Sequence, residues 1–490
     1  MNRPVRRLAV VVALLFASLF ASTTWIQFVR AEALNTTSGN SRQLYAELGR
    51  DRGQITVDGR AIATSVEVEG DDYQYLRQYA DGPLWAPVTG FYSIRYGATG
   101  IERAENDVLA GTSDDLFYRR VTDMLKGEQP RGGSVALTLR PAVQQAASDA
   151  LDGRKGAVVA LDAETGDVLA MVSGPTYDPN RLATHNGTDL TDAWRQLNDD
   201  EDDPLVNRAI GGNLYPPGST FKIVVAAAAL ESGSYTADTL LAGPARLTLP
   251  QTTTTLGNDE GTACGPNDQV SLLDALRESC NTAFASLGMD LGQDAVAEQA
   301  QKFGFGEDLS IPLRVTPSTF PSDLNQPQLA QSSIGQFDVR STPLQVAMLS
   351  AAVANDGVLM KPNLVAEVRD QSFNVVDQPS SDEIGRAVSA DTAATLRTMM
   401  EAVVSRGTGT RAAIPGVEVG GKTGTAQHGV GLPPYAWFTS YAIQGDRKVA
   451  VAVVIEDGGS VDSAYGGRLS APVAKTVMQA ALSDDGWGQR

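Results

Sequence analysis

Cysteine and histidine are scarce in this sequence, and their scarcity excludes several kinds of chemistry. The 490 residues include two cysteines, Cys264 and Cys280, and two histidines, His185 and His428. No HExxH or CxxC pattern occurs, and the ligands are too few for a zinc site of the usual kind. A GxSxG sequence is also absent, which argues against a hydrolase with a Ser-His-Asp triad. We therefore predict no metal site.

Positive charge is limited as well. The formal net charge is −19 and the sequence pI is about 4.6. Because phosphate binding requires clustered lysine and arginine, we expect no nucleic-acid partner. A chain of 490 residues is too long for one compact domain, so its length predicts a large catalytic core and one smaller module.

One long apolar stretch stands near the N-terminus. Residues 8–29 carry no charged side chain and, at ~1.5 Å per residue, can cross a hydrocarbon core of roughly 30 Å. Arg3, Arg6 and Arg7 precede the stretch, and positive charge is retained on the cytoplasmic side of a membrane. We therefore predict a cytoplasmic tail and transmembrane anchor in residues 1–34, with everything after them outside the cytoplasmic membrane.

A cleaved signal peptide is the alternative for this stretch. Ala31, Glu32 and Ala33 form a small-x-small sequence of the kind at which such peptides are cut. The apolar run is longer than that of a usual signal peptide, however. Trp25 and Phe28 lie at its outer end, where aromatic rings favour the membrane interface. These features favour an anchor.

The rest of the chain divides into two regions. Residues 35–150 show no catalytic pattern and predict a small accessory module. This region ends in a strand-like segment and a helix that begins at Pro141 and stops at Gly153. Residues 151–490 form the second region. Its acidic run at 199–203 lacks the glycine of a calcium loop and predicts a solvated surface loop.

Strand patterns stand at both ends of the second region, and helical patterns dominate between them. An early hairpin is predicted at 156–161 and 168–173, and a late group of three strands at 417–426, 434–443 and 448–457. A helix is predicted after them, at 471–482. A sheet built from both ends of a domain predicts an α/β fold. In this fold an antiparallel sheet is covered by helices and joined to an all-helical lobe, with a cleft between sheet and lobe.

A serine and a lysine stand three residues apart in the helical part. Lys222 is the only one of the eight lysines with a serine, Ser219, at this spacing. Residues 219–232 contain no glycine or proline, so we predict a helix that carries both side chains on one face. A serine hydroxyl is a good nucleophile only when a base accepts its proton. A lysine can be that base if its pKa is lowered by burial, by the N-terminus of its own helix and by a second lysine nearby. A chance pairing on an ordinary core helix is the alternative.

An SxN sequence, Ser279 to Asn281, lies in a short turn between two helical patterns. The pattern also occurs at Ser38 and Ser372, so it has little weight alone. We prefer the copy at Ser279 because its turn belongs to the helical lobe, where it could face the Ser219 helix.

Lys422, Thr423, Gly424 and Thr425 contain the only KTG sequence in the chain and lie in the first late strand. Gly424 would let a substrate backbone approach the strand, the threonines would donate hydroxyl hydrogen bonds, and Lys422 would attract a carboxylate. An exposed strand lysine near a turn is the alternative.

In this order, SxxK, SxN and KTGT resemble the three-motif signature of penicillin-interacting serine enzymes. Further segments resemble landmarks of a penicillin-binding transpeptidase domain over roughly 156–482, at 175–180, 207–208, 216–222, 335–336, 342–345 and 436–438. Residues 52–55 and 100–102 resemble the pedestal of class B (monofunctional) penicillin-binding proteins, most like the actinobacterial penicillin-binding protein A group. Residues 35–150 are too few for the glycosyltransferase domain of class A.

This resemblance implies a peptidoglycan D,D-transpeptidase that needs no cofactor, cross-links stem peptides ending in D-Ala-D-Ala and is inhibited by β-lactams. It implies that Ser219 attacks the peptide while Lys222 takes its proton. Ser279 and Lys422 would relay a proton to the leaving amine. A β-lactamase or D,D-carboxypeptidase, and a membrane β-lactam receptor, are alternatives that share this site.

The same resemblance implies binding roles and partners. Asn281 would hold the peptide amide, and the KTGT residues Thr423, Gly424 and Thr425 would line the place of the terminal carboxylate. Backbone N–H groups of Ser219 and Thr425 would form the oxyanion hole. Class B proteins work with a polytopic SEDS-type glycosyltransferase, so that enzyme and other division or elongation proteins are the implied partners.

Cys264 and Cys280 lie 16 residues apart in the part of the chain expected outside the membrane, where disulfides persist. We predict a disulfide that would tether the turn of Ser279 and Asn281. Two free core thiols are the alternative, because Cys280 could simply fill the middle of SxN.

Overall fold

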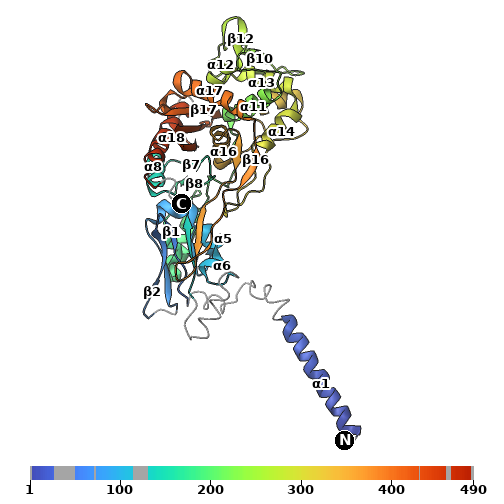
Figure 1. Ribbon diagram of the computed structural model, residues 1–490, viewed down its shortest axis with the longest axis vertical. Helices are drawn as coiled ribbons and strands as arrows, with labels where there is room; N and C mark the ends of the chain where they lie inside the picture. The colour runs from blue at the N-terminus through green and yellow to red at the C-terminus, as the bar shows by residue number, and fades with distance from the viewer. Residues whose placement is uncertain are drawn as a thin grey trace.

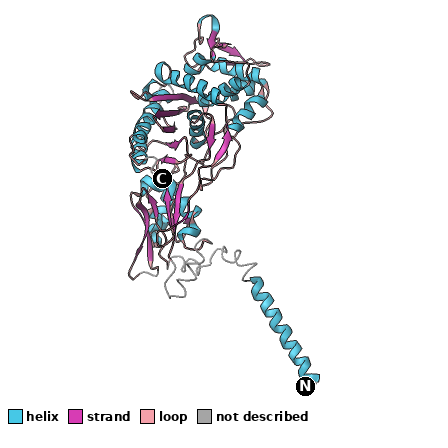
Figure 2. Ribbon diagram, viewed as in Figure 1, coloured by secondary structure: helices cyan, strands magenta, loops and turns pink. Residues whose placement is uncertain are grey.

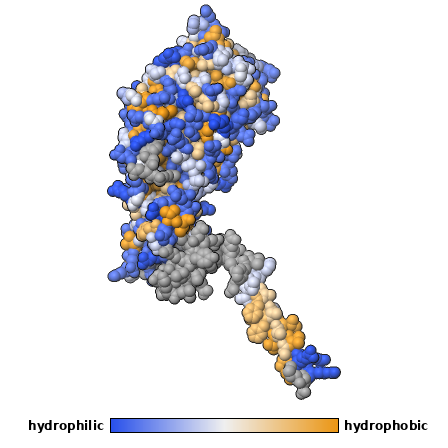
Figure 3. Space-filling view, in the orientation of Figure 1, coloured by the Kyte–Doolittle hydropathy of each residue, from blue (hydrophilic) through white to orange (hydrophobic). Residues whose placement is uncertain are grey.

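The computed structural model describes residues 3–26, 50–70, 73–113, 131–429, 431–459 and 465–486. Within them, one helix is long and apolar enough to cross a membrane: α1 (Arg3–Thr24), of 22 residues. It is apolar along its length and hydrophilic at its arginine end (Figure 3). The helix begins before the predicted stretch at 8–29. Phe28 and the small-x-small sequence lie outside the described residues.

The larger module is built on a five-stranded antiparallel sheet (Figures 1 and 2). β19 pairs with β7, so strands from the two ends of the second region lie side by side, as predicted. The order across the sheet is β17 (Glu418–Ala426), β18 (Tyr435–Gln444), β19 (Arg447–Ile455), β7 (Gly156–Asp162) and β8 (Val168–Gly174).

Helices cover both faces of this sheet. α8 (Pro141–Leu151) and α18 (Gly466–Leu482) pack on the face that includes Val158 and Val451. α16 (Pro343–Ala354) packs on the opposite face. Strands buried on both faces are continuous apolar runs in the sequence, and β7, β8 and β19 were predicted from this pattern.

The lobe beside the sheet contains most of the remaining helices. α11 (Lys222–Glu231) is its buried centre, because its residues are apolar all round. The others are α12 (Leu272–Arg277), α13 (Asn281–Leu291), α14 (Gln293–Lys302), α15 (Gln326–Ser332) and α17 (Ala390–Arg406).

The lobe is not all-helical, in contrast to the prediction. It also carries two small two-stranded sheets, which the sequence did not reveal because three-residue strands have no measurable periodicity. Their strands are β9 (Leu240–Ala242), β10 (Arg246–Thr248), β11 (Thr255–Gly257) and β12 (Gln269–Ser271). α9 (Asn180–Ala183) and α10 (Gly187–Asn198) follow β8 in the chain and pack with Ala86 and Phe91 of the smaller module. β13 (Val358–Met360) and β16 (Glu383–Arg386) form another two-stranded sheet. The acidic run at 199–203 follows α10 and is exposed, as predicted.

The smaller module contains a six-stranded sheet with a late part of the chain at one edge. Its order is β15 (Val375–Asp377), β14 (Val365–Arg369), β6 (Ser134–Leu137), β1 (Ile55–Val57), β2 (Arg60–Glu67) and β3 (Tyr75–Tyr79). Around it lie α4 (Gly82–Thr89), α5 (Gly100–Ala104), α6 (Asn106–Leu109), β4 (Tyr92–Ser93) and β5 (Gly97–Ala98).

The two modules exchange segments. β14 and β15 extend from the larger module into the six-stranded sheet, whereas α8, which precedes residue 151, packs on the five-stranded sheet. The division of the chain at 150 and 151 stays a prediction.

A buried cluster of charges organises the smaller module. Glu102 is fully buried, and its carboxylate accepts hydrogen bonds from Nε of Arg52 at 2.7 Å, Nε of Arg77 at 2.6 Å and Oη of Tyr79 at 3.0 Å. Burial by itself would raise the pKa of Glu102, but the two guanidinium groups hold that pKa below its ordinary value. Arg52 and Glu102 belong to the two segments that resemble the class B pedestal, 52–55 and 100–102, and the hydrogen bond between their side chains joins these segments.

We predict that Glu102→Ala destabilises the protein by about 3–5 kcal/mol, because it leaves two buried guanidinium groups without their anion. Urea denaturation of the full-length protein in detergent, followed by circular dichroism, measures the change. Glu67→Ala, at the exposed end of β2, is the control and should stay within about 0.5 kcal/mol of wild type. Equal small changes in both variants would contradict the assigned role of the cluster.

Candidate active site

Ser219 lies in a tight turn at the start of the buried helix. Gly218–Phe221 form a 3₁₀ turn, η3, that leads directly into α11 at Lys222. The first turn therefore carries the serine, as predicted, although it is tighter than an α-helical turn. Gly218 has a φ of 55°, a left-handed conformation that glycine adopts without strain. Ser219 is 7% exposed and lines a cleft.

Neighbouring segments hold this turn in place. The N–H of Gly218 donates to the carbonyl oxygen of Gly335 at 2.9 Å, and a Cβ at Gly335 would lie 2.0 Å from the Gly218 oxygen. Nε1 of Trp437 donates to the carbonyl oxygen of Pro216 at 3.1 Å. The landmarks at 335–336 and 436–438 thus position the segment that carries Ser219.

The amine of Lys222 is enclosed by protein. Its Nζ donates to the carbonyl oxygen of Ser279 at 2.7 Å, to Oδ1 of Asn281 at 2.7 Å and to Oγ of Ser279 at 3.3 Å. The ring centre of Phe284 lies 5.6 Å from Nζ. Burial lowers the pKa of Lys222 to about 7, while the charge of Asp259 acts in the opposite direction. Much of the lysine is therefore neutral at neutral pH and able to accept a proton.

Ser279 lies between two lysine side chains. It occupies the turn between α12 and α13 with a φ of 62°. Its Oγ accepts from Nζ of Lys422 at 2.8 Å and from Nζ of Lys222 at 3.3 Å. Burial and the charge of Lys222 lower the pKa of Lys422, against the effect of Asp259. A hydroxyl between two amines can pass a proton from one to the other.

The residues of the KTGT sequence lie on β17, the edge strand of the five-stranded sheet. Thr423 and Thr425 line the cleft, and Oγ1 of Thr423 lies 2.7 Å from Oγ1 of Thr408. A Cβ on Gly424 would lie 3.1 Å from the carbonyl oxygen of Pro217. The same Cβ would lie 2.8 Å from Cβ of Trp437, so glycine at this position lets β17 approach both Trp437 and the segment of Ser219. The close approach of a substrate backbone to Gly424 stays a prediction.

A cleft of about 830 Å³ connects these groups. Ser219, Ser279, Thr423 and Thr425 line it, and hydrogen bonds join Ser279 to the two lysines behind the surface. Charged cleft residues that sequence reasoning missed are Asp259, Glu260, Glu278, Arg406, Arg411 and Arg468. They come from loops and helix ends far apart in the sequence and belong to no motif, so no sequence signal could have grouped them.

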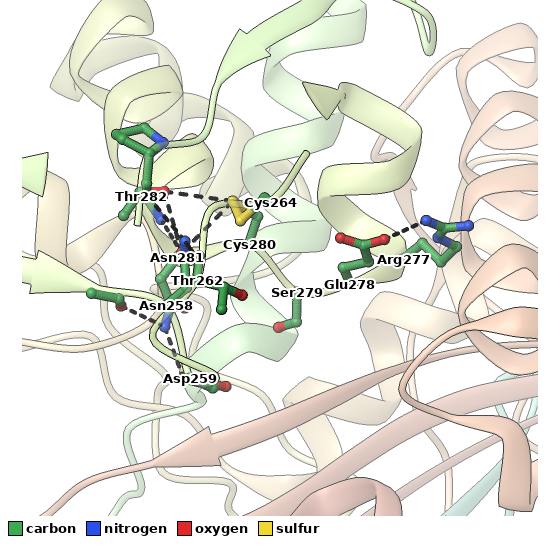
Figure 4. Close-up of a disulfide and its surroundings, with 12 residues drawn as sticks. Asn258, Asp259, Thr262, Cys264, Arg277, Glu278, Ser279, Cys280, Asn281 and Thr282 are labelled. Atoms are coloured by element: carbon green, nitrogen blue, oxygen red, sulfur yellow. Dashed lines mark hydrogen bonds and ion pairs between the residues drawn. A yellow bond between two sulfur atoms is a disulfide. The ribbon is translucent and has the colours of Figure 1, made fainter. Parts of the chain in front are cut away.

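A disulfide closes one side of the cleft. Cys264 and Cys280 are bonded, with their Cα atoms 6.0 Å apart. Figure 4 shows that the bond ties the loop after β11 to the turn before α13. Oδ1 of Asn258, in the same loop, accepts from the N–H of Thr282 at 3.0 Å. The loop is therefore attached at two points to the segment that carries Ser279.

A serine and a buried lysine in successive helical turns, beside a second lysine at a cleft, form the arrangement expected of a serine acyltransferase. Residues 156–479 match the model of the penicillin binding protein transpeptidase domain, and residues 52–135 match that of the penicillin binding protein A dimerisation domain. The chain belongs to the penicillin-binding protein transpeptidase family.

Particular relatives cover nearly the whole chain. Peptidoglycan D,D-transpeptidase PbpA of Mycolicibacterium smegmatis is 46% identical, over 99% of this chain and 100% of the relative. Peptidoglycan D,D-transpeptidase PbpA of Mycobacterium tuberculosis is 42% identical, over 99% of this chain and 100% of the relative. The solved penicillin G acyl-enzyme complex of penicillin-binding protein A from M. tuberculosis is 43% identical, covers 89% of this chain and 100% of that one, and has a TM-score of 0.84. The predicted class B resemblance and the transpeptidase fold are thereby confirmed.

We predict that the rate of acylation by penicillin rises with pH through about 7, because Lys222 accepts a proton only when neutral and its pKa is about 7. Two pH units below that pKa, roughly 1% of the lysine is neutral, so the rate should be ~100-fold below its plateau. Stopped-flow measurements on full-length protein in detergent from pH 5 to 9 test this. Lys222→Ala should lower the plateau by on the order of 10²–10⁴. A flat profile, or a Lys222→Ala rate within tenfold of wild type, would assign the base elsewhere.

The disulfide generates a second prediction. Alkylation of the unreduced, denatured protein should give no cysteine label, and two labels would show that the thiols are free. In the folded protein, reduction should alter the acylation rate more than the unfolding temperature, because the bond tethers the turn that carries Ser279. If acylation is unchanged after reduction, the tether has no part in the chemistry.

Proposed function

We propose that this chain is a peptidoglycan D,D-transpeptidase that works through an acyl-enzyme on Ser219. The observation that carries the proposal is the buried Lys222 amine in the helical turn after Ser219. Its pKa is about 7, and it is hydrogen-bonded to the turn of Ser279 and Asn281. Full-length relatives bear this enzyme name, and a similar solved structure is an acyl-enzyme with penicillin G.

In the first half-reaction, Oγ of Ser219 attacks the carbonyl carbon of the penultimate D-Ala and gives its proton to Lys222. A neutral amine has two N–H bonds and one lone pair. The two shortest contacts of Nζ, both 2.7 Å, would use the N–H bonds and leave the lone pair for the Ser219 proton. The C–N bond to the terminal D-Ala then breaks. The proton reaches the leaving amine through Ser279, whose Oγ lies 2.8 Å from Lys422.

In the second half-reaction, an amine of another stem peptide attacks the ester carbonyl carbon and loses a proton to Lys222. The bond to Ser219 breaks, and its Oγ takes that proton back. Backbone N–H groups of Ser219 and Thr425 would stabilise the oxyanion in both steps, a type of contact worth about 3–4 kcal/mol in barrier. Thr423, Thr425 and Lys422 would receive the terminal carboxylate of the donor peptide.

Two alternatives share the acylation step. A β-lactamase or a D,D-carboxypeptidase would let water hydrolyse the acyl-enzyme, and a membrane β-lactam receptor would signal after acylation. The full-length similarity to proteins named transpeptidase favours transfer to an amine.

The proposal also covers the position of the chain in the cell. We place α1 in the cytoplasmic membrane with Arg3, Arg6 and Arg7 inside, following the positive-inside rule, and the catalytic part outside. A SEDS-type glycosyltransferase and other division or elongation proteins are the proposed partners, on the strength of the class B resemblance. Co-purification from membranes tests these partners.

We predict one covalent penicillin adduct, on Ser219, because a lysine of lowered pKa, Lys222, begins the helix directly after the turn of this serine. Mass spectrometry of the intact protein and of its peptides measures the number and the position. Ser219→Ala should abolish the adduct, whereas Ser372→Ala, which removes a serine of another SxN sequence, should leave it unchanged. An adduct on a different residue would refute the assignment of the nucleophile.

We also predict slow hydrolysis of the acyl-enzyme, since a transpeptidase passes its acyl group to an amine rather than to water. Acylated protein freed of excess penicillin should keep its adduct for far longer than acylation takes. Mass spectra recorded over time measure the loss. Steady multiple turnover of penicillin within seconds would make the protein a β-lactamase.

A further inference from the structure

The amide of Asn281 is held at both of its ends. Its Oδ1 accepts from Nζ of Lys222 at 2.7 Å, and its Nδ2 donates to Oδ1 of Asp259 at 2.9 Å. A longer hydrogen bond of 3.3 Å joins Nδ2 to the carbonyl oxygen of Gly257. Figure 4 shows Asp259 below Asn281, on the loop that the disulfide attaches to the Ser279 turn.

The two ends of an asparagine amide have almost the same shape, so only their partners fix which end points where. A protonated Lys222 can only donate a hydrogen bond, and an ionised carboxylate can only accept one. Asp259 therefore favours the orientation in which the Asn281 oxygen faces Lys222. A rotated amide would place N–H groups against an ammonium and an oxygen against a carboxylate.

We propose that Asp259 is a positioning residue for acyl transfer: by accepting the Nδ2 hydrogen bond, it keeps the Asn281 oxygen on Lys222 and the amine lone pair toward Ser219. The inference rests on the proposed function. Asp259 itself lies on the exposed side of the cleft and acts through Asn281.

Asp259 has a second effect, through its charge. Burial lowers the pKa of both Lys222 and Lys422, and the charge of Asp259 acts against this lowering in both lysines. The charge of Lys222 further lowers the pKa of Lys422, whose Nζ on β17 lies 2.8 Å from the Ser279 hydroxyl between the two lysines. The other charged groups of the cleft lie along its walls: Glu260, Glu278, Arg406, Arg411 and Arg468.

These two effects predict separate changes in the pH profile of acylation. Loss of the hydrogen bond to Asn281 lowers the plateau rate, because the amine of Lys222 is less well oriented. Loss of the negative charge lowers the pKa of Lys222, so the rising limb of the profile moves to lower pH. A residue that only supported the fold would not move that limb.

The experiment measures the acylation rate of full-length protein by penicillin from pH 5 to 9 in two variants. Asp259→Ala should lower the plateau by about threefold to tenfold, the effect of one lost hydrogen bond, and should move the rising limb to lower pH. Asp259→Asn keeps an acceptor for Nδ2 without the charge. It should restore the plateau to within about twofold while the limb stays shifted.

Two controls isolate the path through Asn281. Asp238→Asn removes an equal charge from an exposed position of the same lobe, away from the cleft, and should leave the profile unchanged. In an Asn281→Ala background, Asp259→Ala should lower the plateau by less than about twofold, because coupled residues are not additive. If Asp259→Ala lowers the plateau rate in the Asn281→Ala background as much as in wild type, the positioning role is overturned.

The outcomes separate this inference from the proposed function. If wild-type protein is not acylated on Ser219, the proposed function fails. If wild type is acylated but Asp259→Ala keeps the wild-type plateau and limb, only the role of Asp259 fails. The unfolding temperature of each variant is measured in parallel. If Asp259→Ala does not fold, Asp259→Leu decides, because leucine keeps the size of the side chain but has no acceptor for Nδ2: a lowered plateau supports the positioning role and a wild-type plateau overturns it.

Discussion

The hydrogen bonds from Lys222 to the Ser279 turn are the contacts on which the site depends. A buried ammonium loses its hydration and is stable only if other groups replace the water or if it gives up its proton. Here both occur: Nζ has three hydrogen bonds to Ser279 and Asn281, and the pKa of Lys222 is about 7. The same contacts bring the middle of the lobe against the helix that carries Ser219.

The fold supplies the rigid surroundings that this arrangement needs. α11 is buried along almost its whole length, so Lys222 cannot reach bulk water without disrupting the lobe. β17 is held in position by its pairing with β18. Gly424 lets this strand approach η3 closely, and Gly335 does the same for a neighbouring turn. Three segments far apart in the sequence therefore meet with little freedom, which suits a reaction that requires accurate placement of donors and acceptors.

The parts of the fold and of the site that depend on neighbouring residues in the sequence could be predicted from it. β7, β8 and β19 are mostly continuous apolar runs, and β17 contains the KTGT sequence. Each of the three motifs can be found in the sequence because its residues lie within a few positions of one another. The crossing of β14 and β15 into the smaller sheet could not be predicted, because it depends on contacts between residues far apart in the chain. The contact between Asp259 and Asn281 could not be predicted for the same reason, because an aspartate in a loop belongs to no recognisable sequence motif. Gly424 was found by its motif, but its neighbour became clear only from the packing of η3.

The most direct test of this account is a titration of Lys222 itself. The chain has eight lysines, so lysine labelled with ¹³C at Cε gives a small set of nuclear magnetic resonance signals, and Lys222→Ala identifies the one that belongs to Lys222. In full-length protein in detergent, the account predicts a midpoint near the pKa of about 7, far below that of exposed lysines. A midpoint at the ordinary lysine value of about 10.4 would contradict it, because Lys222 would then be charged throughout the range in which the enzyme works.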